Sequence, residues 1–435
     1  EKLNKYLEMM EPVIENYRGH IDKYTGDGIM CEFGAPIDYD THCLLAVLSG
    51  IKMQEKLRGA DVPWLMRIGI GSGETITGLI GSKRQTYTAI GDVVNVASRL
   101  EEICPPGAVL IDEQTYHKVK NVIDVERLRS FSRKRDDDRA QMELIKANEE
   151  FLKANPLDVD KLLETGRLYF DLREVSEAIE YFEKALSLDP DNKDIKLIYA
   201  DASLKKDQYE KIEIKGKKSR IAVYEVLGIK NIMRDRNRIP EGFYQKYSYV
   251  EGLIEVPDDV ILPIEALDGT IGHSKIVAVI SYAIANFLGL SEREKKNILI
   301  AGYLEDIGKQ IIPHHILNRR GGLSETEIQE VEKHPVESTK ILRSMGFDTE
   351  EILEIVAHHH EMYNGEGYPF GKKGQEIPLG ARITSVADSY NALISWRPYR
   401  EGWEQHAALA EMKNSEKRGK FDPQISEILI NLMSQ

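Results

Sequence analysis

The residues with the clearest potential for chemistry are two adjacent histidines, His359 and His360. They end a segment, 349–360, whose apolar residues recur at helical spacing, so we expect a helix there. His359 falls on the apolar face of that helix, and His360 lies about 100° round, within reach of the same interior. His358 shares its face with charged residues and is expected to be solvated. One inward histidine is commonly a satisfied core residue, but two before a glycine-rich turn favour a metal site.

Carboxylates and another histidine join this pair from other parts of the C-terminal half. Asp388 shares a helical face with small residues, and a carboxylate buried there without a partner would be strongly destabilising. We therefore expect a cation beside it. The inward-facing set, drawn from separate predicted helices, comprises Asp306, His334, His359, His360 and Asp388. Oxygen and imidazole donors without a thiolate favour iron, manganese or zinc.

The helices that must position these groups are marked by their start signals. Residues 253–435 are rich in helical patterns. A Ser-x-x-Glu start at Ser291 predicts a helix that runs through Lys309 and therefore carries Asp306. A second start of this kind at Ser324 predicts a helix that carries His334.

The N-terminal third mixes helical and strand patterns. An amphipathic helix over 2–18 is followed by two strands over 19–34, joined by a tight Gly-Asp-Gly turn, and by a helix over roughly 41–58. A second hairpin is expected over 65–80. Its glycines suggest a dinucleotide-binding loop, but strand alternation follows where that motif requires a helix, so this interpretation fails.

The middle of the chain carries a helical repeat signal. A charge run at 133–139 indicates a solvated connection. Pro156 and Pro190 lie 34 positions apart, and between and around them small and aromatic residues have the spacing of a tetratricopeptide helix pair. The residues that match are Gly166, Tyr169, Ala178, Phe182, Ala185 and Pro190. The unit could bind a protein partner or act as a spacer. Alternating residues over 211–228 then predict another hairpin.

Composition restricts the class of protein. With 435 residues, 42% hydrophobic and 30% charged, the chain should form two or three globular domains. No apolar run reaches about 18 residues and no leader is visible, so neither a membrane span nor a signal peptide is expected. A net charge of −14 argues against nucleic-acid binding. Three scattered cysteines give no disulfide framework and fit a cytoplasmic location.

The N-terminal motifs resemble the class III nucleotidyl cyclase domain. The resemblance covers the segments 23–34, 67–81 and 87–99. It implies a ferredoxin-like α/β fold, a homodimer, magnesium or manganese ions, and cyclic AMP made from ATP. By position it assigns metal binding to Asp27, purine selection to Lys23 and Thr88, and contacts with the ribose and the phosphoryl transition state to Asn95 and Arg99.

This resemblance has one large gap. The family's first strand, with its other metal aspartate, does not precede the helix over 2–18, so we expect this chain to make no cyclic AMP, whereas a version extended by that strand should. The alternative is a cyclase-like fold used only for dimerisation or nucleotide sensing. The hairpin over 211–228 resembles the closing hairpin of the same domain, with Lys215 at the triphosphate, which would make the helical unit an insertion. A separate β-ribbon is the other interpretation.

The C-terminal motifs resemble the HD-GYP domain, a family of metal phosphodiesterases that act on cyclic dinucleotides. The resemblance runs from His273 to Pro423. It implies two divalent ions, iron or manganese, with zinc as a further candidate. By position, the metal ligands are Glu305, Asp306, His334, His359, His360 and Asp388, with His273 in the outer part of the site. Lys309 and Arg397 match groups that face the phosphodiester, and Tyr368 and Pro369 lie in the motif that names the family.

Three positions depart from the family pattern. Glu305 replaces a histidine, which keeps a ligating atom but adds negative charge and favours harder ions. Gly269 replaces the glutamate expected four residues before His273, so a third metal ion is not expected. Asn364 replaces an aspartate.

Together these features predict a multidomain chain, α/β plus all-α, that acts in second-messenger signalling. The expected boundaries are 1–128 and 209–230 for the cyclase domain, 129–208 for the helical insertion, 231–254 for a linker and 255–435 for the HD-GYP domain. The expected reaction is hydrolysis of a cyclic dinucleotide, with cyclic di-GMP the first candidate. The alternative is a regulatory protein whose degenerate domains bind nucleotides without turnover.

Overall fold

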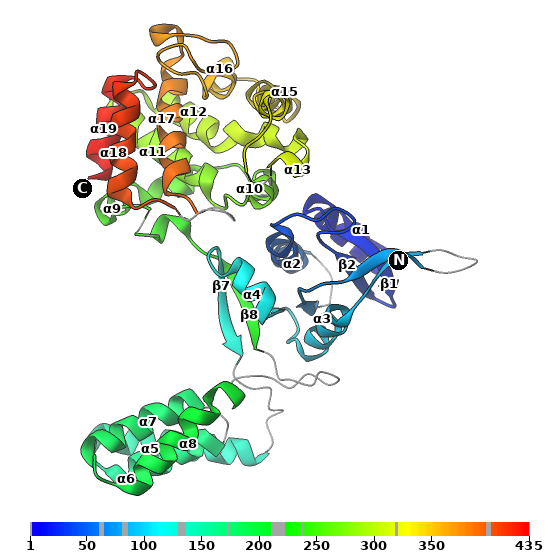
Figure 1. Ribbon diagram of the computed structural model, residues 1–435, viewed down its shortest axis with the longest axis vertical. Helices are drawn as coiled ribbons and strands as arrows, with labels where there is room; N and C mark the ends of the chain where they lie inside the picture. The colour runs from blue at the N-terminus through cyan, green and yellow to red at the C-terminus, as the bar shows by residue number, and fades with distance from the viewer. Residues whose placement is uncertain are drawn as a thin grey trace. The chain divides into compact units, whose positions relative to one another are not determined.

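The structure of the chain is a computed structural model. It describes residues 2–60, 65–80, 86–128, 136–171, 175–209, 222–236, 238–317, 321–396 and 402–434. The chain divides into two compact units, one formed by residues 1–13, 21–30 and 49–229 and the other by residues 14–20, 31–48 and 230–435. Figure 1 follows the chain through these elements.

The strands belong to the N-terminal part of the chain. Its helices are α1 (Lys2–Asn16), α2 (His42–Arg58), α3 (Asp92–Ile103) and α4 (Glu113–Val119). Its strands are β1 (His20–Thr25), β2 (Gly28–Glu32), β3 (Ile68–Ile70), β4 (Ile76–Ile80), β5 (Thr86–Ile90), β6 (Val109–Asp112), β7 (Ile123–Leu128) and β8 (Val223–Ile229). The helices predicted over 2–18 and 41–58 and the strands predicted over 19–34 are confirmed.

The hairpin predicted over 65–80 is wrong in its pairing. β3 pairs in parallel with β6, whereas β4 pairs antiparallel with β5. Gly69 explains part of this arrangement, because a Cβ atom at this position would lie 2.3 Å from the Ala97 carbonyl oxygen. The glycine lets α3 lie directly against β3. The strand is therefore used for close helix packing and for a long-range partner.

The helical repeat interrupts the sheet in sequence. Four helices, α5 (Asp136–Ala154), α6 (Val159–Asp171), α7 (Val175–Leu188) and α8 (Lys193–Tyr209), lie between β7 and β8 in the chain. The four-stranded sheet nevertheless has the order β3-β6-β8-β7, with β8 antiparallel to both of its neighbours. A strand that follows the helical unit thus lies between two strands that precede it.

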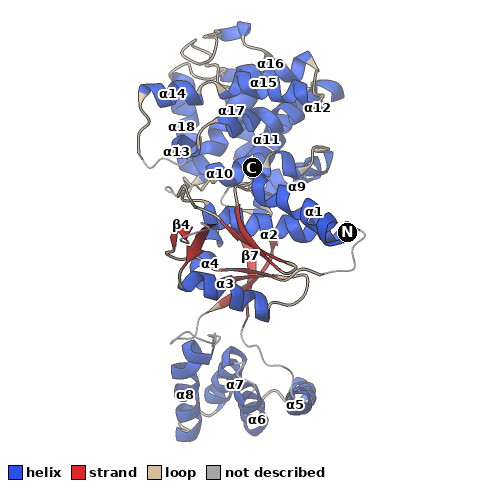
Figure 2. Cartoon of the chain, turned by 90° about the vertical axis from the view of Figure 1, so that its right-hand side faces the viewer, coloured by secondary structure: helices blue, strands red, loops and turns tan. Residues whose placement is uncertain are grey.

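The C-terminal part of the chain is helical (Figure 2). In the described residues after 230, every regular element is an α- or 3-10 helix. The α-helices are α9 (Glu241–Tyr247), α10 (Leu262–Asp268), α11 (His273–Phe287), α12 (Glu292–Leu304), α13 (His314–Leu317), α14 (Glu325–Val331), α15 (His334–Ser344), α16 (Glu350–His358), α17 (Leu379–Ile394), α18 (Gln405–Lys417) and α19 (Pro423–Met433). The 3-10 helices are η1 (Ile232–Arg234), η2 (Ser248–Leu253), η3 (Asp258–Val260), η4 (Glu305–Ile311) and η5 (Gly374–Glu376).

One apolar core holds these helices together. α11 is apolar along most of its length, and nearly all of its side chains are buried. α12 and α17 pack against it, and α16 packs in turn against both. Because these helices present their apolar faces to one core, the polar residues at their ends are brought together. No helix among the described residues is both long and apolar enough to cross a membrane.

The start signals were correct, but two predicted helices end early. Ser291 and Ser324 both form the expected capping boxes. α12 ends at Leu304, and the chain continues as η4. The prediction that the Ser324 helix carries His334 is wrong, because α14 ends at Val331 and His334 begins α15. Pro335 accounts for the break, since a proline lacks the N–H that a helix interior needs but fits the first turn of a new helix.

Candidate metal centre

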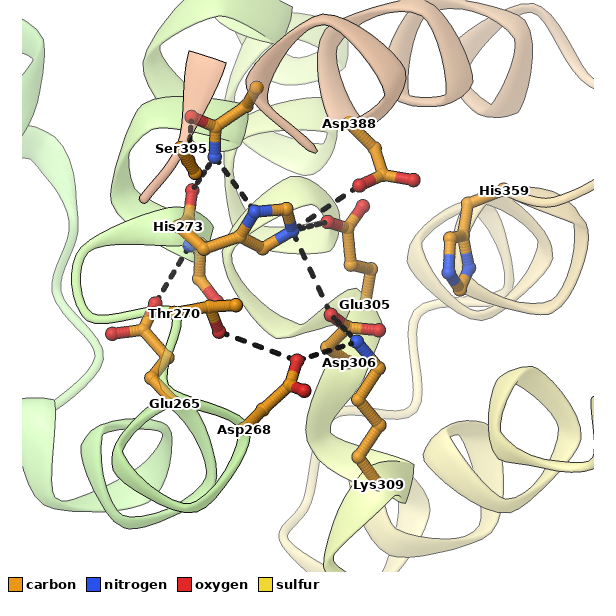
Figure 3. Close-up of polar contacts among 12 residues, drawn as sticks. Glu265, Asp268, Thr270, His273, Glu305, Asp306, Lys309, His359, Asp388 and Ser395 are labelled. Carbon is orange, nitrogen blue, oxygen red and sulfur yellow. Dashed lines mark hydrogen bonds and ion pairs between the residues drawn. The ribbon is translucent and has the colours of Figure 1, made fainter. Parts of the chain in front are cut away.

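Five elements deliver ionisable side chains to one interior region (Figure 3). His273 begins α11, and Glu305 and Asp306 begin η4. His334 begins α15, His359 and His360 follow the end of α16, and Asp388 lies on α17. Most of these side chains are buried. They form two groups, and within each group the ligand atoms all lie within 4.8 Å of one another.

The first group combines three imidazoles with one carboxylate: Asp306, His334, His359 and His360. His334 Nδ1 lies 2.7 Å from the Val331 carbonyl oxygen, and His359 Nδ1 lies 2.7 Å from that of Val356. A carbonyl oxygen only accepts hydrogen bonds, so both Nδ1 atoms carry the hydrogen and both Nε2 atoms present a lone pair. The two Nε2 atoms are 3.4 Å apart. Two lone pairs that face each other in a buried site fit a cation between them.

The second group is richer in oxygen: His273, Glu305 and Asp388. Glu305 has no exposed surface, and neither of its carboxylate oxygens has a hydrogen bond within the described part of the chain. His273 Nε2 lies 3.5 Å from Oε1 of this carboxylate. Asp388 Oδ2 lies 3.8 Å from His360 Nδ1, which links the two groups. A buried carboxylate without hydrogen bonds also fits a metal ion.

For Asp306, His359 and His360, the electrostatics favour the protonation states that metal ligands need. Burial, with the neighbouring His334, lowers the pKa of His359 to about 4, and burial lowers the pKa of His360 further still. Burial alone would raise the pKa of Asp306, but its neighbours, the charge of Lys309 foremost, outweigh burial and hold the pKa well below the usual range. His359 and His360 are therefore neutral and the Asp306 carboxylate is ionised near neutral pH, as ligands of a divalent ion must be.

Lys309 places a positive charge at the edge of this site. Its Nζ lies 2.7 Å from Asp306 Oδ2 and 3.3 Å from Asp268 Oδ2 (Figure 3). Its side chain is mostly buried. An ammonium group held between two carboxylates at the edge of a cation site is well placed to meet an anionic group of a ligand.

The loop after α16 closes over the first group. Tyr368 and Pro369 are joined by a cis peptide bond, and the Tyr368 ring lies on His360, with 4.8 Å between ring centroids. The buried carboxylate of Glu361 holds the loop by accepting the backbone N–H groups of Phe370 and Lys372, at 2.7 and 2.9 Å. The loop is thereby fixed at both ends beside the histidine pair.

Family models match three parts of the chain. The model of the HD domain matches residues 263–425, which contain every residue of both groups. Residues 263–425 form an HD domain. The model of the adenylate and guanylate cyclase catalytic domain matches residues 1–145, and that of the tetratricopeptide repeat matches residues 160–192. The recognition of cyclase, tetratricopeptide and HD domains, and the fold class of α/β plus all-α, are confirmed.

Curated relatives of the HD domain act on cyclic dinucleotides. A cyclic di-GMP phosphodiesterase of Pseudomonas aeruginosa is 38% identical over 153 residues, which cover 35% of this chain and 36% of that protein. A 3'3'-cGAMP-specific phosphodiesterase of Vibrio cholerae is 32% identical over 166 residues, which cover 38% of each chain. The match therefore spans little more than a third of either relative. The crystal structure of the adenylyl cyclase CyaB of P. aeruginosa has a TM-score of 0.32 and 22% identity over 53% of this chain and 82% of its own.

Within the HD domain, one expectation about the histidines was wrong. His358, expected in solvent, is buried, and its ring packs on Phe370 with 4.8 Å between centroids. The loop that Glu361 anchors folds back over the helix end and covers it. Burial accordingly lowers the pKa of His358.

Sequence reasoning also missed three supporting residues of the HD domain. Glu361 holds the loop after α16 by accepting two backbone N–H groups. Asn391, one helical turn after Asp388, contacts His273, and Ser338 accepts the Gly308 N–H and donates to the Glu305 carbonyl oxygen. The one available signal was the placement of Asn391 on the same helical face as Asp388.

The cyclase domain brings two of its predicted site residues together. Lys23 Nζ on β1 lies 3.5 Å from Thr88 Oγ1 on β5. Thr88 donates a 2.7 Å hydrogen bond to Asp22, and Lys23 lies 3.4 Å from the same carboxylate. Asp27 is exposed in the turn between β1 and β2.

The remaining predicted residues lie elsewhere. Asn95 is exposed on α3 and Arg99, one turn later, forms an ion pair with Glu102 at 2.6 Å. Lys215 and Arg397 lie outside the described residues.

Proposed function

We propose that the HD domain is a metal-dependent phosphodiesterase of the HD-GYP type that hydrolyses a cyclic dinucleotide. The observation that carries the proposal is the pair of adjoining ligand groups, joined through Asp306 and Asp388, in the buried interior beside a lysine. Cyclic di-GMP is the first candidate substrate and 3'3'-cGAMP the second, since the relatives act on one or the other. Two divalent ions, iron or manganese with zinc as a further candidate, would complete the site.

The chain's own residues would divide the work. Divalent ions, when bound, supply Lewis acidity and a water molecule whose pKa is lowered towards neutrality. The three imidazoles and Asp306 would hold one ion, and Glu305 and Asp388 would hold the other. Lys309 would bind a non-bridging phosphate oxygen through Nζ. Tyr368, packed on His360, would bound the space in which the substrate lies. Hydrolysis consumes one water, whose hydroxyl adds to phosphorus while its proton goes to the departing ribose oxygen.

Turnover by the metal-loaded chain tests this proposal. We expect the wild-type chain to convert cyclic di-GMP or 3'3'-cGAMP to a linear dinucleotide, and the Asp306→Ala variant to bind neither metal nor substrate productively. Lys309→Ala should keep the metal but lose roughly 10- to 150-fold in kcat/KM, the equivalent of one charge-assisted hydrogen bond of about 1.5–3 kcal/mol. Full metal occupancy and tight binding without product would instead favour the regulatory alternative, in which the domain is a receptor.

We also propose that the cyclase domain binds ATP, with Mg or Mn at Asp27, and that it forms a homodimer in the cell. The contact that favours ATP over GTP is the ammonium of Lys23, a donor, beside the oxygen of the Thr88 hydroxyl, an acceptor, because the edge of adenine presents a ring-nitrogen acceptor and an amino donor. The location of β8 within the sheet supports the proposed insertion of the helical unit, residues 129–208. That unit would serve as a spacer or bind a protein partner, and the protein would act in the cytoplasm. Equal binding of ATP and GTP would contradict the assigned selectivity.

A further inference from the structure

The side chain of Asn391 determines which nitrogen of His273 carries a hydrogen. Asn391 is fully buried on α17. Its Nδ2 atom lies 3.1 Å from the His273 carbonyl oxygen and 2.8 Å from His273 Nδ1. The carbonyl oxygen can only accept a hydrogen bond, so the amide nitrogen must face it. The second hydrogen of the same NH₂ group is then directed at Nδ1.

Ser395 holds the amide in this orientation. Its hydroxyl donates to Asn391 Oδ1 at 3.0 Å, so the amide oxygen is already satisfied on its other side. If the amide were turned over, Oδ1 would lie 3.1 Å from the His273 carbonyl oxygen, and two acceptors would face each other in a buried site. The network of Ser395, Asn391 and the α11 backbone therefore assigns Nδ1 of His273 as an acceptor.

The consequence falls on the other ring nitrogen. In a neutral imidazole whose Nδ1 accepts, Nε2 carries the hydrogen. His273 Nε2 faces three carboxylates, with Asp388 Oδ1 at 3.3 Å, Glu305 Oε1 at 3.5 Å and Asp306 Oδ2 at 3.7 Å. Figure 3 shows the ring pointing at this group. An N–H group orients carboxylates but cannot bind a metal ion. His334 and His359 have the opposite tautomer, because their Nδ1 atoms donate to backbone carbonyls.

We propose that His273 orients the carboxylates of the second group and is not a metal ligand, so that Glu305, Asp388 and Asp306 form an all-oxygen site for Mn²⁺ or Mg²⁺. This inference rests on the proposed metal-dependent function of the domain. Oxygen donors suit magnesium and manganese, whereas imidazole suits zinc and iron. The two ion positions therefore differ in preference: the histidine group takes zinc or iron, and the carboxylate group takes the harder ion.

Nitrogen coupling to bound Mn²⁺ tests the assignment directly. The full chain is stripped of metal, given one equivalent of Zn²⁺ to fill the histidine group, and titrated with Mn²⁺. Electron spin-echo envelope modulation then detects nitrogen bound to manganese. We expect the wild-type chain and His273→Gln to give the same nitrogen signal. In Asn391→Asp, a carboxylate accepts the hydrogen of Nδ1 and frees Nε2, so this variant should gain a nitrogen coupling that Asn391→Asp/His273→Gln lacks.

Metal affinities give a second readout that needs no catalysis. Glu305→Gln should lower Mn²⁺ affinity by more than about 100-fold, whereas His273→Gln should cost no more than the roughly 10- to 100-fold that outer-shell changes cost. Zn²⁺ affinity should stay within twofold in both variants. A nitrogen coupling in the wild-type chain that His273→Gln abolishes would overturn the proposal. Should Asn391→Asp not fold, the wild-type and His273→Gln comparison still decides. Manganese bound as described without turnover would refute the phosphodiesterase and leave this inference standing.

Discussion

Glu305 is the residue that sets the character of the second ligand group. Its carboxylate is completely buried, and burial raises its pKa well above the ordinary value, helped by the charges of Asp388 and Asp306. An ionised carboxylate in this position destabilises the metal-free fold, because its lost hydration is not replaced by hydrogen bonds. A divalent ion offsets that cost. The residue therefore opposes folding without metal and favours it with metal.

This opposition predicts a pH-dependent effect of Glu305→Gln on stability. A carboxyl group whose pKa is higher in the folded than in the unfolded state does not lower the stability of the protein at a pH below its unfolded-state pKa. As the pH rises from there through the folded-state pKa, the protein loses stability. In the metal-free chain at pH 8, Glu305→Gln should thus be more stable than the wild type by roughly 1–3 kcal/mol, the cost of an unsatisfied buried group. The gap should close as pH falls towards 4.5.

Denaturant unfolding with a chelator present measures this effect, and the exposed Glu325→Gln on α14 is the matched control. With saturating Mn²⁺ the order should reverse, because the glutamine is a poorer ligand. A variant less stable than the wild type in the metal-free chain at pH 8 would show that Glu305 is stabilised by the protein alone.

At the scale of elements, the site depends on how closely η4 lies against α15. A Cβ atom at Gly308 would be 2.2 Å from the His334 carbonyl oxygen and 2.7 Å from the Ser338 backbone nitrogen. The same contact carries the hydrogen bond from Gly308 N to Ser338 Oγ, at 2.8 Å. This close approach brings Asp306 Oδ1 to 3.3 Å from His334 Nε2. The backbone packing therefore fixes a distance between two ligands.

Gly308→Ala should consequently damage stability and metal binding together. The added methyl group forces η4 away from α15, which should cost about 1–3 kcal/mol or more, as overpacking does. Because Asp306 and His334 then separate, Zn²⁺ affinity should fall as well. Thermal unfolding and metal titration of the variant measure both effects. Gly252→Ala, where an added Cβ meets nothing within 4 Å, serves as the control and should match the wild type. An unchanged zinc affinity in Gly308→Ala would show that the packing of η4 against α15 does not determine the distance between Asp306 and His334.

The parts of these elements that the sequence predicted are those determined locally. The capping boxes at Ser291 and Ser324 depend on side chains three residues apart, and the apolar face that carries His359 depends on helical spacing. The parts it missed depend on distant partners. β3 pairs with β6 instead of its neighbour β4, and His358 is buried by a loop that Glu361 holds. The tautomer of His273 is set by Asn391, a residue 118 positions away.

At the scale of the whole molecule, the two predicted activities use separate sets of residues. The metal ligands come from elements between His273 and Asp388, and the contact proposed to select the purine joins β1 to β5. The two sets share no residue. The chain thus combines a region that matches the adenylate and guanylate cyclase catalytic domain with an HD domain whose relatives include a cyclic di-GMP phosphodiesterase.

This separation predicts that each function can be removed alone. Asp306→Ala should abolish metal binding in the HD domain while leaving the affinity for ATP within twofold of the wild type. Lys23→Ala should lower ATP affinity roughly 10- to 150-fold, the equivalent of one charge-assisted hydrogen bond of about 1.5–3 kcal/mol, and leave dinucleotide hydrolysis unchanged. Calorimetric ATP titration and product analysis on the same preparations measure both, with the exposed Lys153→Ala of the helical unit as the control. Loss of ATP binding in Asp306→Ala would instead reveal energetic coupling between the domains.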